Sequence, residues 1–168
     1  NALERWMDAF PTSARFDAAW HPYCISRRIP VWISLLSQAP APPALHGRIL
    51  SSLASQVAYL SRHLEQDLGG NHLWENAKAL ALAGSFFCGR KAQRWLDCGT
   101  RWLDHCIESQ ISDSGEHFER SPGYQAELQE GLLYVAAELA DLKPQQSQLY
   151  RAPANRLACF LDRPRHPD

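Results

Sequence analysis

Two short polar segments hold most of the side chains in this sequence that are suited to acid–base chemistry. They are residues 69–76, with the sequence GGNHLWEN, and residues 115–124, with the sequence GEHFERSPGY. Each opens an apolar stretch that has the periodicity of a buried helix. Because the unpaired amides and the positive dipole end of a helix favour an anion, both segments indicate a negatively charged ligand such as a carboxylate.

The elements between these segments are expected to bring them together. A helix predicted over about residues 91–110 carries the chain back across the domain, so the helices that begin at Asn71 and Pro122 should start at the same end. The dipole at a helix start also stabilises a phenolate, which makes Tyr124 a candidate proton carrier. The first turns are expected to share one rim, made of Asn71, His72, Glu75, Asn76, His117, Glu119, Arg120 and Tyr124.

Each of these residues also has a purely structural interpretation. Asn71 belongs to the residue types that cap helix N-termini. His72 is equally consistent with a structural histidine, and Tyr124 with a packed ring. Glu119 and Arg120 are consistent with a solvated turn pair that contributes less than about 1 kcal/mol. The residues alone leave both interpretations open.

The cysteines are predicted to be free thiols in the core and to bind no metal. They are odd in number, and four of them lie within apolar helical patterns. Cys98, His105 and Cys106 lie seven and eight positions apart on one predicted helix and supply at most three zinc ligands. The five thiols are Cys24, Cys88, Cys98, Cys106 and Cys159.

Length and charge favour one soluble domain over residues 1–168. The 17 Lys and Arg residues nearly balance the 18 Asp and Glu residues, which argues against a nucleic-acid partner. No apolar run approaches the roughly 20 residues that would span a bilayer, and the first ten residues lack the pattern of a signal peptide. We expect no membrane insertion, and both ends are consistent with a fragment of a longer protein.

Apolar periodicity predicts an all-α fold of antiparallel helix hairpins. Apolar residues recur at spacings of three and four along the chain, and no run of alternating apolar and polar residues has the length of a strand. Ser121 and Pro122 have the residue types of an N-cap and a first helical position. The helix that opens at Asn71 is apolar on nearly all sides and is expected to be buried, with Gly89 at its C-terminal end. The predicted helices cover about residues 18–37 with interruptions near Pro22 and Pro30, 45 to before 69, 71–88, 91–110, 122 to beyond 139, and 146–161, and the proline-rich residues 39–43 form a loop.

Three segments resemble a known family. Residues 70–87, GNHLWENAKALALAGSFF, are similar to the signature helix of the heparinase II/III-like polysaccharide lyases, and residues 117–124, HFERSPGY, resemble their second signature. Residues 20–32, WHPYCISRRIPVW, resemble the helix that precedes both. The segments occur in the family's order and span most of the chain between Trp20 and Tyr124.

The resemblance implies an incomplete (α/α) toroid, followed in the same protein by a large antiparallel β-sandwich that this chain is expected to lack. The implied reaction is β-elimination on an acidic polysaccharide, a uronate-containing glycan of heparan, heparin or alginate type. One side chain neutralises the carboxylate, a base removes the C5 proton and an acid protonates the departing oxygen. No cofactor is implied, and the expected compartment is the periplasm or the outside of the cell.

The family roles carry over to three positions of this sequence. Asn71 matches the amide that binds the carboxylate, and His72 matches a second neutralising group of some members. Tyr124 matches the tyrosine that transfers the proton, so these three are the predicted catalytic residues. The predicted substrate-binding residues are Arg28, Glu75, His117, Glu119 and Arg120, with the two arginines as forked donors to sugar carboxylates or sulfates.

Two departures from the family pattern keep other functions open. Gln125 follows Tyr124 where many relatives have His, and the β-sandwich that should supply a further catalytic group is not in this sequence. The fragment alone is therefore expected to be inactive. A catalytically silent domain that binds acidic glycan is the first alternative. A helical interaction module, which predicts exposed apolar patches, is the second.

Overall fold

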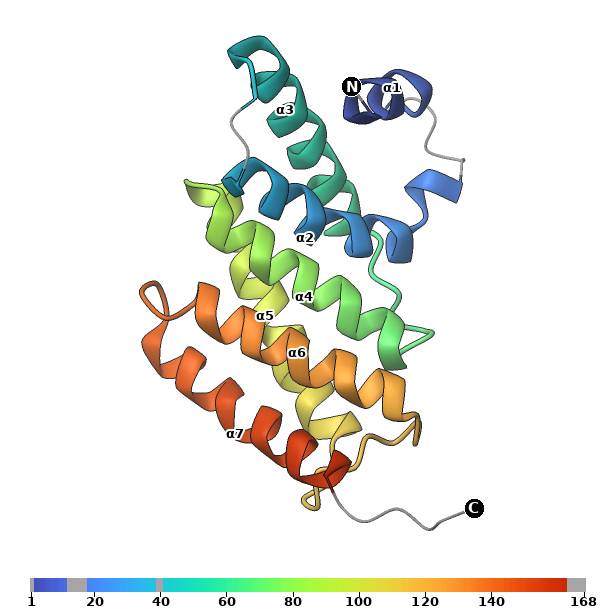
Figure 1. Ribbon diagram of the computed structural model, residues 1–168, viewed down its shortest axis with the longest axis vertical. Coiled ribbons are helices and arrows are strands. Elements are labelled where there is room, and N and C mark those ends of the chain that lie inside the picture. Colours follow the sequence, from blue (N-terminus) through green and yellow to red (C-terminus); the bar gives the residue numbers. More distant parts are fainter. Residues whose placement is uncertain (1, 12–17, 39–40, 163–168) are drawn as a thin grey trace. The chain divides into compact units, whose positions relative to one another are not determined.

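The described part of the computed structural model, residues 2–11, 18–38 and 41–162, is built from helices (Figure 1). It contains no β-strand, only an isolated antiparallel bridge between Ile111 and His117. No helix in these ranges is long and apolar enough to span a membrane. The predicted all-α class is confirmed. The elements are α1 (Ala2–Ala9), the 3₁₀ helix η1 (Ala18–Trp20), α2 (Pro22–Gln38), α3 (Pro43–Leu60), α4 (Gly70–Phe86), α5 (Arg90–Gln110), α6 (Pro122–Glu138) and α7 (Pro144–Leu161).

The chain divides into two compact units, Asn1–Gly99 and Thr100–Asp168. The boundary falls inside α5, so the first half of this helix belongs to the first unit and the second half to the second. The single domain expected over residues 1–168 stays a prediction.

The core of the first unit lies around α4, as its apolar sequence predicts. Helix α2 packs along α4, and α3 contacts both. The start of α5 approaches α4 so closely that a Cβ on Gly99 would collide with the backbone of Ala81, and one on Gly84 with the backbone of Leu96. Two glycines therefore set the distance between these helices. The fully buried side chains of α4 include Trp74, Ala77, Leu80 and Ala81.

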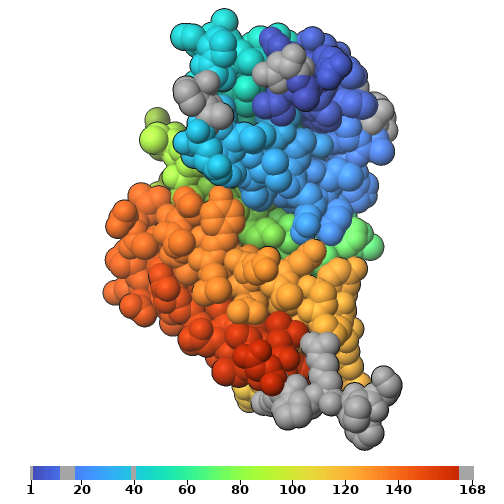
Figure 2. Space-filling model, in the orientation of Figure 1, coloured from blue at the N-terminus to red at the C-terminus, as the bar shows by residue number. Residues whose placement is uncertain are grey.

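The second unit is held together by the antiparallel hairpin of α6 and α7, which lie side by side as orange and red surfaces in Figure 2. The Ser147 hydroxyl donates a hydrogen bond of 2.6 Å to the carbonyl of Ala136. The Tyr150 hydroxyl donates one of 3.2 Å to the carbonyl of Thr100 on α5. These bonds add directional contacts to an apolar interface of Leu128, Leu132, Val135, Ala154 and Leu157.

The predictions for α2 and α3 are each wrong at one point. Pro30 does not interrupt α2, because the buried side chains of Ile29 and Trp32 on either side of it anchor the helix through the proline. Helix α3 ends at Leu60 and not just before residue 69 as predicted, so Leu64 lies outside it. At this end the Ser61 hydroxyl donates to the carbonyl of Ala58 at 3.0 Å, a local bond that competes with further helical turns.

The limits of α4 also differ from the prediction. The helix begins one residue earlier, at Gly70, and ends at Phe86, and Gly89 lies in the turn that follows with a φ of 88°. Helix α1 was not predicted at all, and of the predicted loop 39–43, residues 39–40 lie outside the described residues. All five cysteines are free, but only Cys106 is buried; Cys24, Cys88 and Cys159 are exposed, so the prediction of core thiols is wrong for these three.

Candidate functional site

Two glycines turn the chain sharply into α4 and place Asn71 in its first turn. Gly69 and Gly70 have φ values of 61° and 48°, in the left-handed region that glycine adopts without steric cost. Gly69 is the N-cap, so the prediction of Asn71 as the cap is wrong. The amide of Asn71 instead donates a hydrogen bond of 3.4 Å to the hydroxyl of Tyr23 on α2, and the residue is 5% exposed. Asn71 therefore links the start of α4 to α2 and does not cap the helix.

The imidazole of His72 is held from two sides. Its Nδ1 lies 2.8 Å from Oε1 of Glu65, and its ring packs on the ring of Tyr23 with centroids 4.5 Å apart. The His72 side chain is 42% exposed. With Nδ1 engaged by a carboxylate, Nε2 is the ring nitrogen left for a ligand, because the partner of one nitrogen fixes the role of the other.

Glu65 is fixed by a reciprocal pair of hydrogen bonds to α4. The carboxylate of Glu65 accepts a hydrogen bond of 3.0 Å from Nδ2 of Asn76. The backbone N–H of Glu65 donates one of 2.9 Å to Oδ1 of Asn76. Nε2 of His21 lies 3.8 Å from the carboxylate, which is 7% exposed. The sequence did not predict Glu65 or Tyr23 as site residues, because Glu65 lies in the segment taken for helix and Tyr23 carries no spacing signal.

Glu75 points into the first unit. Its Oε1 is 2.6 Å from Nζ of Lys78 and 3.4 Å from Nη1 of Arg27, and the residue is completely buried. Its other oxygen, Oε2, is buried without a hydrogen-bond partner in the part of the chain that the structure describes. The substrate-binding role of Glu75 stays a prediction.

Arg28 ties three elements of the first unit together. Its Nε donates to Oε1 of Gln56 on α3 at 2.7 Å, and its Nη2 donates to the carbonyl of Ala19 in η1 at 2.8 Å. The guanidinium also lies 4.2 Å above the ring of Trp6, and burial lowers its pKa to about 10. These contacts give Arg28 a structural role, and its predicted binding of substrate stays a prediction.

The start of α6 has the local structure that its sequence predicts. Ser121 is the N-cap, and its hydroxyl accepts a hydrogen bond of 3.4 Å from the backbone N–H of Tyr124, while Pro122 occupies the first turn. The Tyr124 residue is 40% exposed. Tyr124 therefore lies at a helix N-terminus in contact with solvent, and its catalytic role stays a prediction.

Gln125 fastens the turn before α6. Its Nε2 donates to the carbonyls of Gly115 and Leu157 at 3.1 and 3.0 Å, and its Oε1 accepts from the backbone N–H of His117 at 3.2 Å. His117 is fully buried, with Nε2 3.3 Å from Oε1 of Gln110. Burial lowers the pKa of His117, and the carboxylate of Glu119 opposes this shift. The substrate-binding role predicted for His117 remains untested.

The two other predicted binding residues of this turn are exposed. Arg120 has a φ of 53°, uncommon for a residue with a side chain, and its Nε lies 3.7 Å from Oε1 of Glu116. Glu119 is also exposed. The structure thus groups Asn71 with His72 in the first unit and Glu119, Arg120 and Tyr124 in the second, and the rim that would join both groups stays a prediction. The described residues hold no cluster of three or more His, Cys, Asp or Glu side chains suited to a metal.

Known proteins resemble this chain over nearly its whole length. Residues 2–160 match the family described as Heparinase II/III N-terminus. The chain is 28% identical over 161 residues to the heparin-sulfate lyase of Bacteroides thetaiotaomicron, in an alignment that covers 88% of this chain and 23% of that relative.

Solved structures agree in fold. The crystal structure of heparinase III matches 95% of this chain with a TM-score of 0.73 and 24% identity. The heparan sulfate lyase HepC from Pedobacter heparinus matches equally well, at 25% identity. This chain spans only 26% of the length of each. The match confirms the predicted fold, the helical toroid portion of such an enzyme, and the chain belongs to the heparinase II/III N-terminal family.

Proposed function

We propose that the protein containing this chain is a polysaccharide lyase that cleaves a uronate-containing glycan by β-elimination. The observation that carries the proposal is the family match over residues 2–160, together with relatives named as lyases of heparin or heparan sulfate. This chain would supply the helical part of the substrate site. The substrate is a heparan-like, heparin-like or alginate-like polysaccharide, met in the periplasm or outside the cell.

The first turn of α4 suits the binding of the uronate carboxylate. The side-chain amide of Asn71 can donate hydrogen bonds to a carboxylate, and the N-terminal end of the helix adds a positive dipole. Nε2 of His72 is a second donor when it carries a proton. Neutralising the carboxylate acidifies C5–H and stabilises the enolate-like intermediate, which is the largest contribution expected in such a reaction.

Tyr124 is the proposed proton carrier. The C5 proton leaves to a base, the electron pair forms the C4–C5 double bond, the C4–O bond breaks, and the departing oxygen takes a proton from the phenol. The exposed position of Tyr124 at the N-terminal end of α6 suits this transfer because a ligand in solution can reach it. A joint site of Tyr124 and Asn71 is part of the proposal.

The test uses the whole natural polypeptide that contains this chain. It is incubated with heparan sulfate, heparin, alginate and a neutral glucan, and the ultraviolet absorbance of the unsaturated uronate ends is followed. We expect growth of absorbance on one acidic polysaccharide only. Asn71→Ala should lower kcat/KM by about 10²–10³, the loss typical of one stabilising donor, whereas Asn155→Ala, on the exposed side of α7, should leave it unchanged.

Binding without cleavage is the alternative function that one observation favours. Gln125 replaces the His of many relatives and is engaged by three backbone groups, so it is not free to orient the phenol of Tyr124. If the polypeptide bound an acidic polysaccharide that it did not cleave, and Asn71→Ala weakened the binding, the silent glycan-binding function would replace the lyase function.

A further inference from the structure

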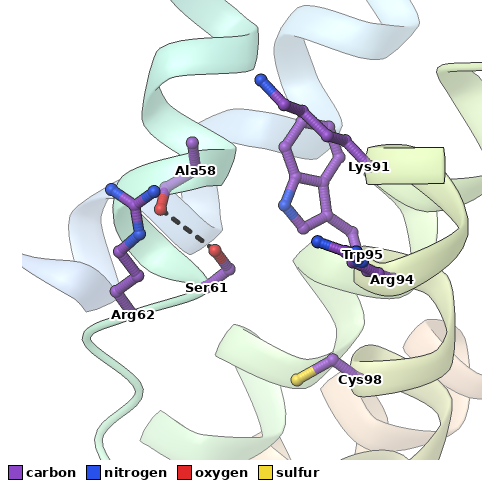
Figure 3. A pocket seen from close by; sticks show the side chains of 7 residues that line it. All are labelled: Ala58, Ser61, Arg62, Lys91, Arg94, Trp95 and Cys98. Carbon is purple, nitrogen blue, oxygen red and sulfur yellow. Dashed lines mark hydrogen bonds between the residues drawn. The ribbon is translucent and has the colours of Figure 1, made fainter. Parts of the chain in front are cut away.

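The first unit has a pocket of about 320 Å³ whose lining includes three basic residues (Figure 3). One wall is the end of α3 with the residues just after it, and the other is the first half of α5. No carboxylate lines the pocket, and none of its residues has a role in the reaction proposed above. The lining residues are Ala58, Ser61, Arg62, Lys91, Arg94, Trp95 and Cys98.

The three basic side chains of the pocket are exposed, and none forms a side-chain hydrogen bond or ion pair with another described residue. Other arginines of the same unit do: Arg27 pairs with Glu75, Arg28 with Gln56 and Arg48 with Asp8. Lys91 also lies in the first turn of α5, where the dipole of the helix adds positive potential. Three basic residues that line one pocket without acidic partners among its lining residues indicate a site for an anion.

Trp95 gives this pocket more than charge. The indole is partly buried and packs edge-on against the ring of Phe87, with centroids 5.9 Å apart, which fixes its orientation. An aromatic face contacts the apolar face of a sugar ring well, and the indole N–H donates a hydrogen bond. The volume lies near the lower end of the range of about 300–1,000 Å³ typical of small-ligand sites. The Ser61 hydroxyl adds an acceptor, because its proton is committed to the carbonyl of Ala58.

We propose that the α3–α5 pocket binds an anionic sugar unit of a polysaccharide. The sulfate or carboxylate of the sugar is held by Arg62, Lys91 and Arg94, and the ring lies against Trp95. The identification of the ligand as part of a glycan rests on the proposed function. The pocket could bind an anionic saccharide even if the protein did not cleave it. The pocket would be a second anchoring site that holds a long chain on the protein.

The test reads the pocket directly, through the indole N–H signal of Trp95 in the nuclear magnetic resonance spectrum of the whole polypeptide. The signal is assigned as the one missing from Trp95→Phe. It is followed during titration with a heparin-derived tetrasaccharide, an alginate-derived tetrasaccharide, a neutral maltotetraose and inorganic sulfate. We expect a saturable shift with at least one acidic tetrasaccharide, at lower concentration than with inorganic sulfate, and none with the neutral sugar.

Paired variants separate contact from overall charge. In the double variant Lys91→Gln, Arg94→Gln, the tetrasaccharide concentration that half-saturates the shift of the Trp95 signal should rise roughly tenfold. This is the loss of affinity expected for two charge pairs at a partly exposed site. The double variant Arg5→Gln, Arg90→Gln also removes two positive charges, but from residues outside the pocket lining. It should change the half-saturating concentration less than about twofold. The circular dichroism of both variants should match that of the unchanged protein.

Three results would overturn the proposal: a Trp95 signal unmoved by both acidic tetrasaccharides, equal titration by inorganic sulfate, or equal weakening by both double variants. The outcome is separable from that of the lyase assay. A responsive Trp95 in a protein without lyase activity supports the pocket and contradicts the proposed function. An unresponsive Trp95 in an active enzyme does the reverse.

Discussion

Oε1 of Glu65 lies 2.8 Å from Nδ1 of His72, and this contact joins the irregular segment before α4 to the first turn of that helix. The carboxylate that makes it is nearly buried, whereas the imidazole is well exposed. A buried group thus orients a ring that reaches solvent, an arrangement that would position His72 for the ligand of the proposed function.

We therefore expect Glu65→Gln to lower activity more than stability. The amide keeps the shape of the side chain but no longer favours one orientation of the His72 ring, and kcat/KM should fall by up to about a hundredfold, as for a misplaced reacting group. Asp67→Asn is the matched control, since Asp67 lies exposed in the same segment. Equal rates for Glu65→Gln and the unchanged enzyme would remove the positioning role.

Gln125 is expected to be a stability residue. Gln125→Ala removes all three of its hydrogen bonds and takes these partners from the carbonyl of Gly115 and from the backbone N–H of the buried His117. The free energy of unfolding should fall by about 2–4 kcal/mol, since unsatisfied buried groups cost about 1–3 kcal/mol each. Urea denaturation measures this, with the exposed Gln148→Ala as control. A loss of unfolding free energy below about 1 kcal/mol would contradict the stabilising role of the three Gln125 hydrogen bonds.

The stability of the second unit should depend on pH through His117. Burial lowers the pKa of its imidazole below the ordinary value of about 6.5 that it regains on unfolding. The unfolded chain then binds more protons, so this contribution is fully present above pH of about 6.5 and is lost as the pH falls through the lower, folded pKa. Urea denaturation from pH 8 to pH 5 should show the decline, and His117→Gln should reduce it. An unchanged decline in that variant would assign it to other groups.

The close approach of α4 and α5 predicts opposite effects of two Gly→Ala substitutions. A methyl group on Gly99 would meet the backbone of Ala81 and Ala77, so Gly99→Ala should destabilise the protein by about 1–3 kcal/mol or more. Gly47 lies exposed in α3 with nothing within 4 Å of its would-be Cβ, so Gly47→Ala should stabilise the protein by up to about 1 kcal/mol. Thermal unfolding tests both, and destabilisation by Gly47→Ala would contradict the described packing.

The sequence predicted helix starts and helix burial well where local residue types determine them. Ser121 and Pro122 marked the start of α6, and the apolar run of α4 indicated its burial. The errors come from tertiary contacts. Packing of Ile29 and Trp32 carries α2 through Pro30, and side-chain bonds to the last carbonyls end α3 before Leu64.

The site was predictable only in part for the same reason. Asn71 and His72 stand in a motif, whereas Glu65 reaches His72 through a loop whose path depends on Asn76. Likewise Arg28 is recognisable as a basic residue, but nothing in its spacing reveals that Gln56 and Ala19 already engage it. Contacts between residues on distant elements produce no recognisable spacing in the sequence, so they could not be predicted from it.

The most direct test of the central claim is the effect of Tyr124→Phe on the formation of unsaturated uronate ends by the whole polypeptide. The substitution removes one exposed hydroxyl at the start of α6 and should leave folding unchanged. We predict that product formation falls by about 10²–10⁴, the contribution of a general acid or base, while binding of the polysaccharide persists. Undiminished product formation by a correctly folded Tyr124→Phe enzyme would contradict the proposed role of Tyr124 in the elimination.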